Sequence, residues 1–226
     1  MLKLIVQEPK YQINIGYVAR VAKNFGLKQI CFVKPRTKLL GITAIKFAKH
    51  ARSLLEHAKV YSSLQEAVKG CDMIIGTTGV WEKAKSHGKN VMTIDRLAKE
   101  LSKRRHRCVA LILGRDDIGM SKEELASCDA VAYIPANPKY PVLNISHALA
   151  VMLYELSKAR LTNIYQISKD LPTRKELDLL FREFEKMVSS KENIRNKNEV
   201  SRVFRNLVLN ARLSKKEVHA LITALK

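Results

Sequence analysis

The sequence lacks the features that mark membrane, secreted and disulfide-linked proteins. No apolar run among its 226 residues approaches the length of a bilayer-spanning helix. The amino-terminal residues MLKLIVQEPK contain neither the long apolar stretch nor the small-residue cleavage site of a secretory signal. The four cysteines form no CxxC pair and lie in or beside apolar runs, at Cys31, Cys71, Cys108 and Cys128. We expect buried, reduced thiols and a cytoplasmic protein.

The motifs of common nucleotide, metal and hydrolytic sites are also missing. There is no GxGxxG after the first apolar run and no GxxxxGK[ST], which excludes a classical dinucleotide site and a P-loop. No GxSxG marks a nucleophilic serine. The six histidines are scattered without paired acids, so we expect no metal site. Aromatic residues make up only 6% of the chain, which disfavours stacking along single strands as the main mode of RNA binding.

Acidic residues are scarce relative to basic ones. The chain has 41 lysines and arginines against 21 aspartates and glutamates, a formal net charge of +20. Residues 20–59 contain ten basic residues and one acid, and residues 83–107 contain nine basic residues and two acids. Solvated faces usually mix the two signs, so this imbalance indicates a polyanionic partner, with a generally basic proteome as the plain alternative. Nucleic acid is favoured over an anionic membrane because no amphipathic or lipidated anchor is evident.

Short runs rich in β-branched residues alternate with helical patterns over the first 160 residues. We predict strands at residues 2–6, 29–33, 58–61, 72–78, 108–114 and 130–135. We predict helices at residues 14–26, 62–68, 93–104 and 121–128, and a long apolar helix that starts near residue 145. The strands are continuously apolar and are separated by helices. The fold class is therefore α/β, with a mostly parallel sheet flanked by helices.

The pattern changes after residue 159, where no further strand is predicted. Three helices follow, of which the first begins at Thr173 with Glu176 three residues later, and the last begins at Ser214. The polar residues 189–199 are predicted to connect the first two. We predict a main domain at 1–160, a linker at 161–172 and a helical RNA-binding extension at 173–226. The tail from residue 160 onward carries fifteen basic and eight acidic residues.

Polar segments rich in glycine and proline follow three of the predicted strands: GTTGV at 76–80, GRDDIG at 114–119 and IPANPKYPVLNIS at 134–146. In open α/β sheets ligands bind outside the carboxyl ends of the strands, so we expect one flat polar ligand where these segments meet. Pro135, Pro138 and Pro141 stiffen the third segment because proline fixes φ and removes a backbone donor. Each segment alone also has a plain interpretation, since strand ends usually carry turn residues.

Three motifs together resemble the SpoU–TrmD (SPOUT) superfamily of trefoil-knot RNA methyltransferases, and most closely its TrmJ-type tRNA ribose methyltransferases. They are EPKYQINIGYVAR (Glu8–Arg20), LGRDDIGMS (Leu113–Ser121) and IPANPKYPVLNIS (Ile134–Ser146). They occur in the family's order and spacing over residues 1–160, and the helical tail resembles the TrmJ extension more loosely. The resemblance implies a deep trefoil knot, S-adenosylmethionine as cofactor, tRNA as partner and a homodimer.

The resemblance also implies roles for individual residues. The catalytic set is Arg20, Asn14 and Ser146, with helix capping as the alternative for Asn14 and Ser146. Because guanidinium stays protonated, we expect Arg20 to clamp the target phosphate and place the ribose oxygen, although proton acceptance stays open. The implied cofactor-binding residues are Thr77, Thr78, Gly79, Gly114, Arg115, Asp116, Ile134, Pro135, Leu143, Asn144 and Ser146. The expected RNA-binding residues are Arg20, Lys34, Arg36 and Lys38.

By this resemblance the chain is a methyltransferase that acts on a ribose 2′-hydroxyl of tRNA, at nucleotide 32 of the anticodon loop. One departure from the family pattern is Asp116, a shorter acid where the family more often has glutamate. The same chemistry on ribosomal RNA is the nearest alternative, since no residue reports the target. A noncatalytic RNA-binding protein on this fold is the second. The third, a nucleotide-dependent enzyme unrelated to RNA, is disfavoured by the missing glycine fingerprint and the charge.

Overall fold

A parallel sheet forms the centre of the molecule in the computed structural model, which describes residues 1–80, 90–103, 106–158, 171–211 and 213–225. Seven strands pair in the order β3-β2-β1-β6-β4-β7-β5, and every neighbouring pair is parallel. Their bounds are β1 Leu2–Gln7, β2 Ile30–Val33, β3 Lys59–Tyr61, β4 Met73–Thr78, β5 Val91–Thr93, β6 Val109–Leu113 and β7 Ala130–Tyr133. The predicted α/β class with a parallel sheet is therefore confirmed.

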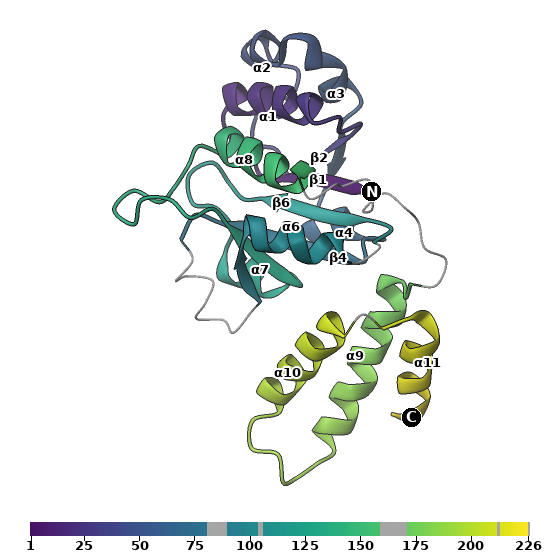
Figure 1. Cartoon of the computed structure of the whole chain (residues 1–226). Coiled ribbons are helices and arrows are strands. Elements are labelled where there is room, and N and C mark those ends of the chain that lie inside the picture. Colours follow the sequence, from purple (N-terminus) through teal and green to yellow (C-terminus); the bar gives the residue numbers. More distant parts are fainter. Residues whose placement is uncertain (81–89, 104–105, 159–170, 212, 226) are drawn as a thin grey trace.

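Helices cover both faces of this sheet and continue beyond it (Figure 1). In the main part of the chain they are α1 Gln12–Asn24, α2 Ile42–Ala48, α3 Arg52–Glu56, α4 Leu64–Val68, α6 Ile94–Ser102, α7 Lys122–Ala126 and α8 Ile145–Lys158, with a short 3₁₀ turn at Lys49–Ala51. The tail consists of α9 Arg174–Ser189, α10 Lys197–Asn210 and α11 Lys215–Ala224. Among the described helices none is both long and apolar enough to cross a lipid bilayer.

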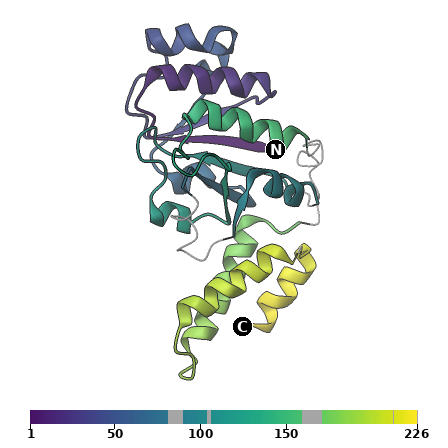
Figure 2. The same ribbon diagram turned by 60° about the vertical axis from the view of Figure 1, so that its left-hand side comes forward.

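Two apolar cores lie on opposite faces of the sheet because successive side chains of a strand point to opposite sides. Leu4 and Val6 of β1 pack into a core with α1, α2, α6 and α8. Ile5, between them, packs into a second core with α4 and α7. Helices α1 and α8 lie side by side on the first face in both views (Figures 1 and 2).

The close approach of α1 and α2 depends on a glycine. A Cβ atom at Gly16 of α1 would lie 2.5 Å from the carbonyl oxygen of Ala44 and 2.9 Å from the backbone nitrogen of Ala48. Any side chain at this position would therefore push α2 away, together with the loop before it. That loop, residues 34–41, carries the predicted RNA-binding lysines.

The structure adds elements that the sequence patterns did not predict. Strand β5 is only three residues long and follows a segment outside the described residues, so its pattern was too short to distinguish. Helices α2 and α3 were also missed, because they are short and interrupted by the 3₁₀ turn. The polar connector between α9 and α10 is shorter than predicted, because α9 extends to Ser189 and α10 begins at Lys197.

The last three helices have an apolar core of their own, formed by Leu177, Leu180, Phe181, Val208, Val218 and Ile222. They contact the sheet through Asp129, whose side chain is fully buried at the start of β7. Arg174 of α9 donates to both oxygens of this carboxylate, over 2.8 and 2.6 Å, and Arg205 of α10 lies 3.6 Å away. The predicted linker falls almost entirely on residues outside the described part of the chain, so its bounds stay a prediction, as does the knot.

Candidate active site

The three polar segments identified in the sequence meet because β6, β4 and β7 are neighbours in the sheet. Their carboxyl ends open into a cavity of about 290 Å³, near the lower end of the usual range for small-molecule sites of about 300–1,000 Å³. Lining residues that the sequence predicted as cofactor contacts are Thr77, Thr78, Gly79, Gly114, Arg115, Asp116, Ile134 and Leu143.

The loop after β6 is closed on itself and forms one wall of the cavity. Arg115 and Gly119 exchange backbone hydrogen bonds of 3.2 and 3.1 Å across it. A Cβ atom at Gly114 would lie 2.4 Å from both the carbonyl carbon of Gly119 and the nitrogen of Met120, so only glycine fits here. The loop therefore has one compact conformation, which fixes the backbone groups that face the cavity.

The end of β4 provides the wall opposite this loop. The Thr77 hydroxyl donates to the carbonyl oxygen of Ile112 over 2.8 Å, so its side chain is hydrogen-bonded to the neighbouring strand β6. Gly79 lies against the third segment, since a Cβ atom there would be 3.3 Å from the Cα of Val142. Glycine at this position keeps the cavity open between β4 and the segment before α8.

A chain of polar side chains connects all three motifs beside the cavity. Asp116 accepts hydrogen bonds from the backbone nitrogen of Lys10 (2.8 Å) and from the Asn14 amide (2.7 Å). Asn14 Oδ1 in turn accepts from Asn144 Nδ2 over 3.0 Å. Asn144 Oδ1 accepts from both the backbone nitrogen (2.9 Å) and the hydroxyl (2.8 Å) of Ser146. The aspartate thus holds the start of α1 against the site.

These contacts bear on helix capping, the alternative given for Asn14 and Ser146. Helix α1 begins at Gln12 after Tyr11, so Asn14 lies inside the helix and the N-cap interpretation for it is wrong. Asn144 directly precedes α8 and accepts from the nitrogen of Ser146, as an N-cap residue does. The Ser146 side chain is buried, and its hydroxyl donates to that same asparagine.

An ionic network on the β1 side of the cavity was not predicted. Glu8 follows β1 with φ of 42°, in the left-handed region that non-glycine residues rarely adopt. Its carboxylate forms ion pairs with Arg36 and Arg115. Arg115 also donates to both oxygens of Glu124, each over 2.9 Å. The hydrogen bond from Arg115 is the main reason that the pKa of Glu8 lies below its usual range. Arg115 therefore ties the first motif to the second.

The shape and chemistry of the cavity fit a ligand with an apolar body and polar edges. Its apolar lining includes Ile118, Met120, Val142, Ile145 and Met152, while the glycines at 79 and 114 expose backbone. S-adenosylmethionine combines a planar base, a ribose, a sulfonium and an amino-acid end, and the mixture of backbone and apolar surface suits it. The sequence did not identify the two methionines, because apolar residues in α8 and after a turn look like ordinary core positions.

Several predicted site residues do not line this cavity. Pro135, Asn144 and Ser146 lie outside the lining, the last two beside it through Asn14. Arg20 is exposed on α1, about 9 Å along the helix axis from Asn14 at about 1.5 Å per residue. No side-chain hydrogen bond or ion pair links Arg20 to another described residue. In one chain, the predicted catalytic arginine therefore stands apart from the predicted cofactor site.

The predicted RNA-binding residues after β2 lie on one exposed loop. Lys34 and Lys38 are exposed, and Lys34 has φ of 44°. Arg36 is also exposed, but its Nε donates to Glu8 over 2.9 Å. The two lysines are therefore the less constrained cations of this loop. Their role in binding RNA stays a prediction.

Fold and cavity together define an α/β protein with a small-molecule site outside the carboxyl ends of parallel strands. Residues 1–154 match the model of the SpoU rRNA Methylase family. The chain belongs to this family, which confirms the resemblance read from the three motifs. It is therefore a methyltransferase, and S-adenosylmethionine is the methyl donor.

Relatives of known description cover the whole chain. A protein of Methanocaldococcus jannaschii described as tRNA (cytidine-2′-O-)-methyltransferase TrmJ is 33% identical over 232 residues, spanning 100% of this chain and 99% of the relative. The crystal structure of TrmJ from Z. mobilis ZM4 is 25% identical, with a TM-score of 0.72 and coverage of 100% and 97%. A probable methylase family protein from Haemophilus influenzae Rd KW20 is 30% identical, with a TM-score of 0.65 and coverage of 99% and 95%.

Proposed function

We propose that this protein methylates a ribose 2′-hydroxyl of tRNA, at nucleotide 32 of the anticodon loop. The cavity where the three polar segments converge is the observation that carries the proposal, because residues of the second and third motifs line it. Beside it, Asn14 of the first motif is hydrogen-bonded to both of those motifs. The printed name of the M. jannaschii relative supports both the tRNA substrate and the 2′-oxygen. The choice of nucleotide rests on the resemblance to TrmJ-type enzymes alone.

In this proposal the reaction needs positioning more than acid–base catalysis by the protein. S-adenosylmethionine supplies an electrophilic methyl group bonded to a sulfonium sulfur. Arg20 clamps the phosphate of the target nucleotide through two parallel hydrogen bonds, which places the ribose oxygen in line with that methyl. The O–CH3 bond would form as the sulfonium S–CH3 bond breaks, leaving S-adenosylhomocysteine, and the hydroxyl proton would leave to solvent or to a phosphate oxygen. Asn14 and Ser146 keep the start of α1 and the start of α8 in register.

A homodimer is part of the proposal, because Arg20 does not reach the cavity within one chain. Helices α1 and α8 lie side by side, and each exposes apolar side chains to solvent: Ile13 on α1 is 38% exposed, and Val151 and Tyr154 on α8 are 38% and 54% exposed. Pairing of these two helices with those of a second copy would cover the apolar side chains. It would also bring Arg20 of one protomer towards its partner. Light scattering of the purified protein tests this association.

Phosphate contacts would supply most of the affinity for RNA. Lys34, Lys38 and the ion-paired Arg36 present cations on the loop after β2, which Arg36 ties to Glu8 of the first motif. The three tail helices, predicted as a separate extension, would grip the folded RNA by its shape. We propose the cytoplasm as the place where the enzyme meets its substrate.

The decisive test is transfer of labelled methyl from S-adenosylmethionine to unmodified total tRNA and, separately, to ribosomal RNA. The expected result is a 2′-O-methylated nucleoside in tRNA, which mapping then assigns to position 32. If only ribosomal RNA were methylated, the tRNA substrate would be wrong and ribosomal RNA would be the substrate. Cofactor binding without transfer to either RNA would contradict the proposed substrate class.

A further inference from the structure

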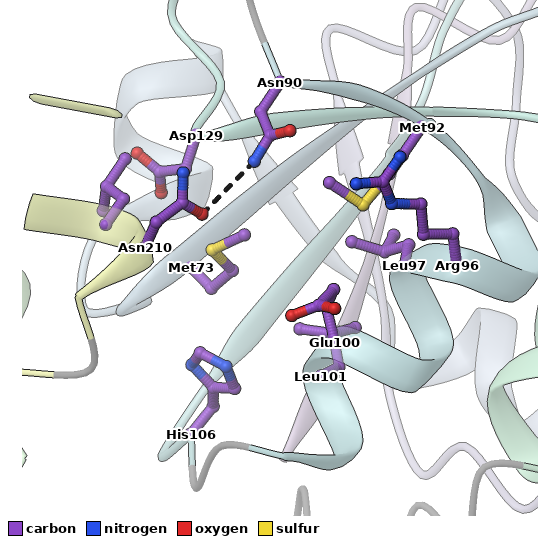
Figure 3. A pocket seen from close by; sticks show the side chains of 11 residues that line it. Met73, Asn90, Met92, Arg96, Leu97, Glu100, Leu101, His106, Asp129 and Asn210 are labelled. Carbon is purple, nitrogen blue, oxygen red and sulfur yellow. Dashed lines mark hydrogen bonds between the residues drawn. The ribbon is translucent and has the colours of Figure 1, made fainter. Parts of the chain in front are cut away.

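A second cavity, of about 330 Å³, lies between the sheet and α10, away from the active site. Its lining comes from the amino-terminal end of β4, from β5, α6 and the last turn of α10 (Figure 3). Met73 at this cavity and Thr78 at the active site are the two ends of one strand. The two sites are thus about 17 Å apart along β4, at about 3.3 Å per residue.

One buried polar atom in this cavity has no partner. The His106 side chain is 10% exposed, and its Nε2 makes no hydrogen bond within the described part of the chain. Its other ring nitrogen, Nδ1, lies 3.5 Å from Oδ2 of Asp72. Asp72 is itself fixed by the backbone nitrogens of Arg107 (2.9 Å) and Cys108 (2.6 Å). The carboxylate therefore orients the imidazole and leaves Nε2 for a ligand, since an unmet buried polar group is costly.

Two carboxamides lie at the opposite end of the cavity from His106 (Figure 3). Asn90 Nδ2 donates to Asn210 Oδ1 over 3.4 Å, which joins the residue before β5 to the last residue of α10. This contact is long for an amide hydrogen bond, and the Asn90 carboxamide keeps a second N–H and its oxygen for further hydrogen bonds. The occupant therefore meets His106 at one end and Asn90 at the other, where the Asp129 carboxylate, paired with Arg174, also lines the cavity.

Apolar side chains separate these polar ends. Met73, Met92, Leu97 and Leu101 contribute to the lining, with Met73 between His106 and Asn210 in the close-up view (Figure 3). Thioethers contact aromatic rings favourably and adapt to a flat surface. A planar ring with hydrogen-bonding edges fits these groups together, because its faces can contact the methionines while its edge reaches His106.

We propose that this cavity binds a nucleobase. The bases combine aromatic faces with edges of alternating donors and acceptors, which match the methionines on one hand and His106 and Asn90 on the other. Carboxamides can pair with a base edge through two hydrogen bonds at once. Arg96 also lines the cavity and adds a guanidinium to the same edge recognition.

The base comes from the RNA substrate, so this inference rests on the proposed function. Arg96, Lys99 and Lys103 follow at intervals of three and four residues on the exposed side of α6, beside the cavity. They belong to the basic window 83–107 identified in the sequence. A strand of RNA along this row would place phosphates on the cations and one unstacked base in the cavity, as proteins read single-stranded loops and bulges. The base also bridges the sheet and α10.

Two variants test the site by different means. His106→Asn keeps a donor near Asp72 and removes the nitrogen that faces the cavity. Asn210→Phe places a ring at the cavity mouth from an exposed position on α10, and Asn206→Phe, one turn earlier and outside the lining, is its control. We expect the KM for tRNA to rise about tenfold in the first two, equivalent to about 1.4 kcal/mol. The kcat, the affinity for S-adenosylmethionine and the melting temperature should match those of the control.

A second assay distinguishes a site for free nucleotides from a site for a base of RNA. It titrates the protein with AMP, CMP, GMP and UMP and monitors the NMR signal of the His106 ring. Nucleotide binding that Asn210→Phe abolishes would support a nucleobase site even if no RNA were methylated, in which case the proposed function alone would fail. An effect on tRNA with no mononucleotide binding would assign the base to RNA. Variants that equal the control in both assays would overturn the proposal.

Discussion

The Asn144 side-chain amide donates to the side-chain oxygen of Asn14 over 3.0 Å, joining two residues that are 130 positions apart. Asn14 lies in the first turn of α1 and Asn144 caps α8, so one hydrogen bond fixes the starts of two helices relative to each other. Asn14 also donates to Asp116, which adds the loop after β6 to the same connection. The walls of the active site are therefore set by side chains as well as by the sheet.

Replacing Asn144 should separate its two tasks. Asn144→Ala removes the cap of α8 and the bond to Asn14, so we expect a loss of about 1–2 kcal/mol of stability and weaker cofactor binding. Asn144→Asp keeps an acceptor for the nitrogen of Ser146 but cannot donate to Asn14. It should regain much of the stability without regaining the cofactor affinity. Thermal unfolding and calorimetric titration with S-adenosylmethionine measure the two effects, and equal recovery of both would show that the Asn14 contact is unimportant.

Arg20→Ala should reduce methyl transfer by at least about a hundredfold, as misplacement of a reacting group does. Because Arg20 lies outside the cavity lining, the affinity for S-adenosylmethionine should stay nearly unchanged. Arg52→Ala is the control, since Arg52 is also exposed and its Nε donates to Glu56 on the same helix over 2.8 Å. A large loss of cofactor binding in the Arg20 variant would contradict the role assigned to it.

Gly114→Ala should distort the loop after β6, because the new methyl group would overlap Gly119 and Met120 backbone atoms at 2.4 Å. Backbone cannot yield as a flexible side chain does, so we expect cofactor binding to fall by an order of magnitude or more, about 1.4 kcal/mol for each factor of ten. Gly79→Ala meets its nearest neighbour at 3.3 Å and should lose much less. Calorimetry on the two variants gives the comparison, and an equal loss in both would argue against the closed loop.

Arg174→Ala should destabilise the contact between the tail helices and the sheet. It leaves the fully buried Asp129 carboxylate with Arg205 at 3.6 Å, and removing one partner of a buried pair costs about 3–5 kcal/mol. Lys186→Ala, which breaks an exposed pair with Glu183, should cost less than about 1 kcal/mol. Urea unfolding measures the cost, and small-angle scattering shows whether the tail has moved. Equal stabilities would mean that the tail is held by other contacts.

The tail helices should lose stability in acid through Glu176. Burial raises the pKa of this carboxyl, but hydrogen bonds from Thr173, His219 and Lys215 outweigh it and lower the pKa from 4.5 to about 2. A folded-state pKa below the unfolded one gives stability that is present above pH 4.5 and is lost as the pH falls towards 2. Glu176→Gln should therefore melt at a lower temperature than the natural protein at pH 6, with the difference shrinking below pH 4.5. A constant difference across this range, in melts followed by circular dichroism, would contradict the assignment.

The amino-acid pattern was sufficient for elements with strong local signals. Six strands were recognised because each is a run of apolar or β-branched residues next to glycine, proline or a charged turn. The helix beginning at Arg174 was recognised from Thr173 and Glu176, whose reciprocal hydrogen bonds are present in the structure. Strand β5 and helices α2 and α3 were missed, since three to seven residues carry too little periodicity.

The sequence alone was also sufficient to recognise the family and the residues of three loops. Glycine, proline and asparagine stand at fixed spacing in these loops because their backbone geometry requires them, and this local pattern can be recognised without knowing where the loops lie in the fold. Only the tertiary structure decided that β6, β4 and β7 are neighbours, that Arg115 bridges Glu8 and Glu124, and that His106 faces a second cavity. Such contacts join residues up to 130 positions apart. They follow from the order in which parallel strands pair, and strand order is set by packing of the whole chain rather than by any local pattern.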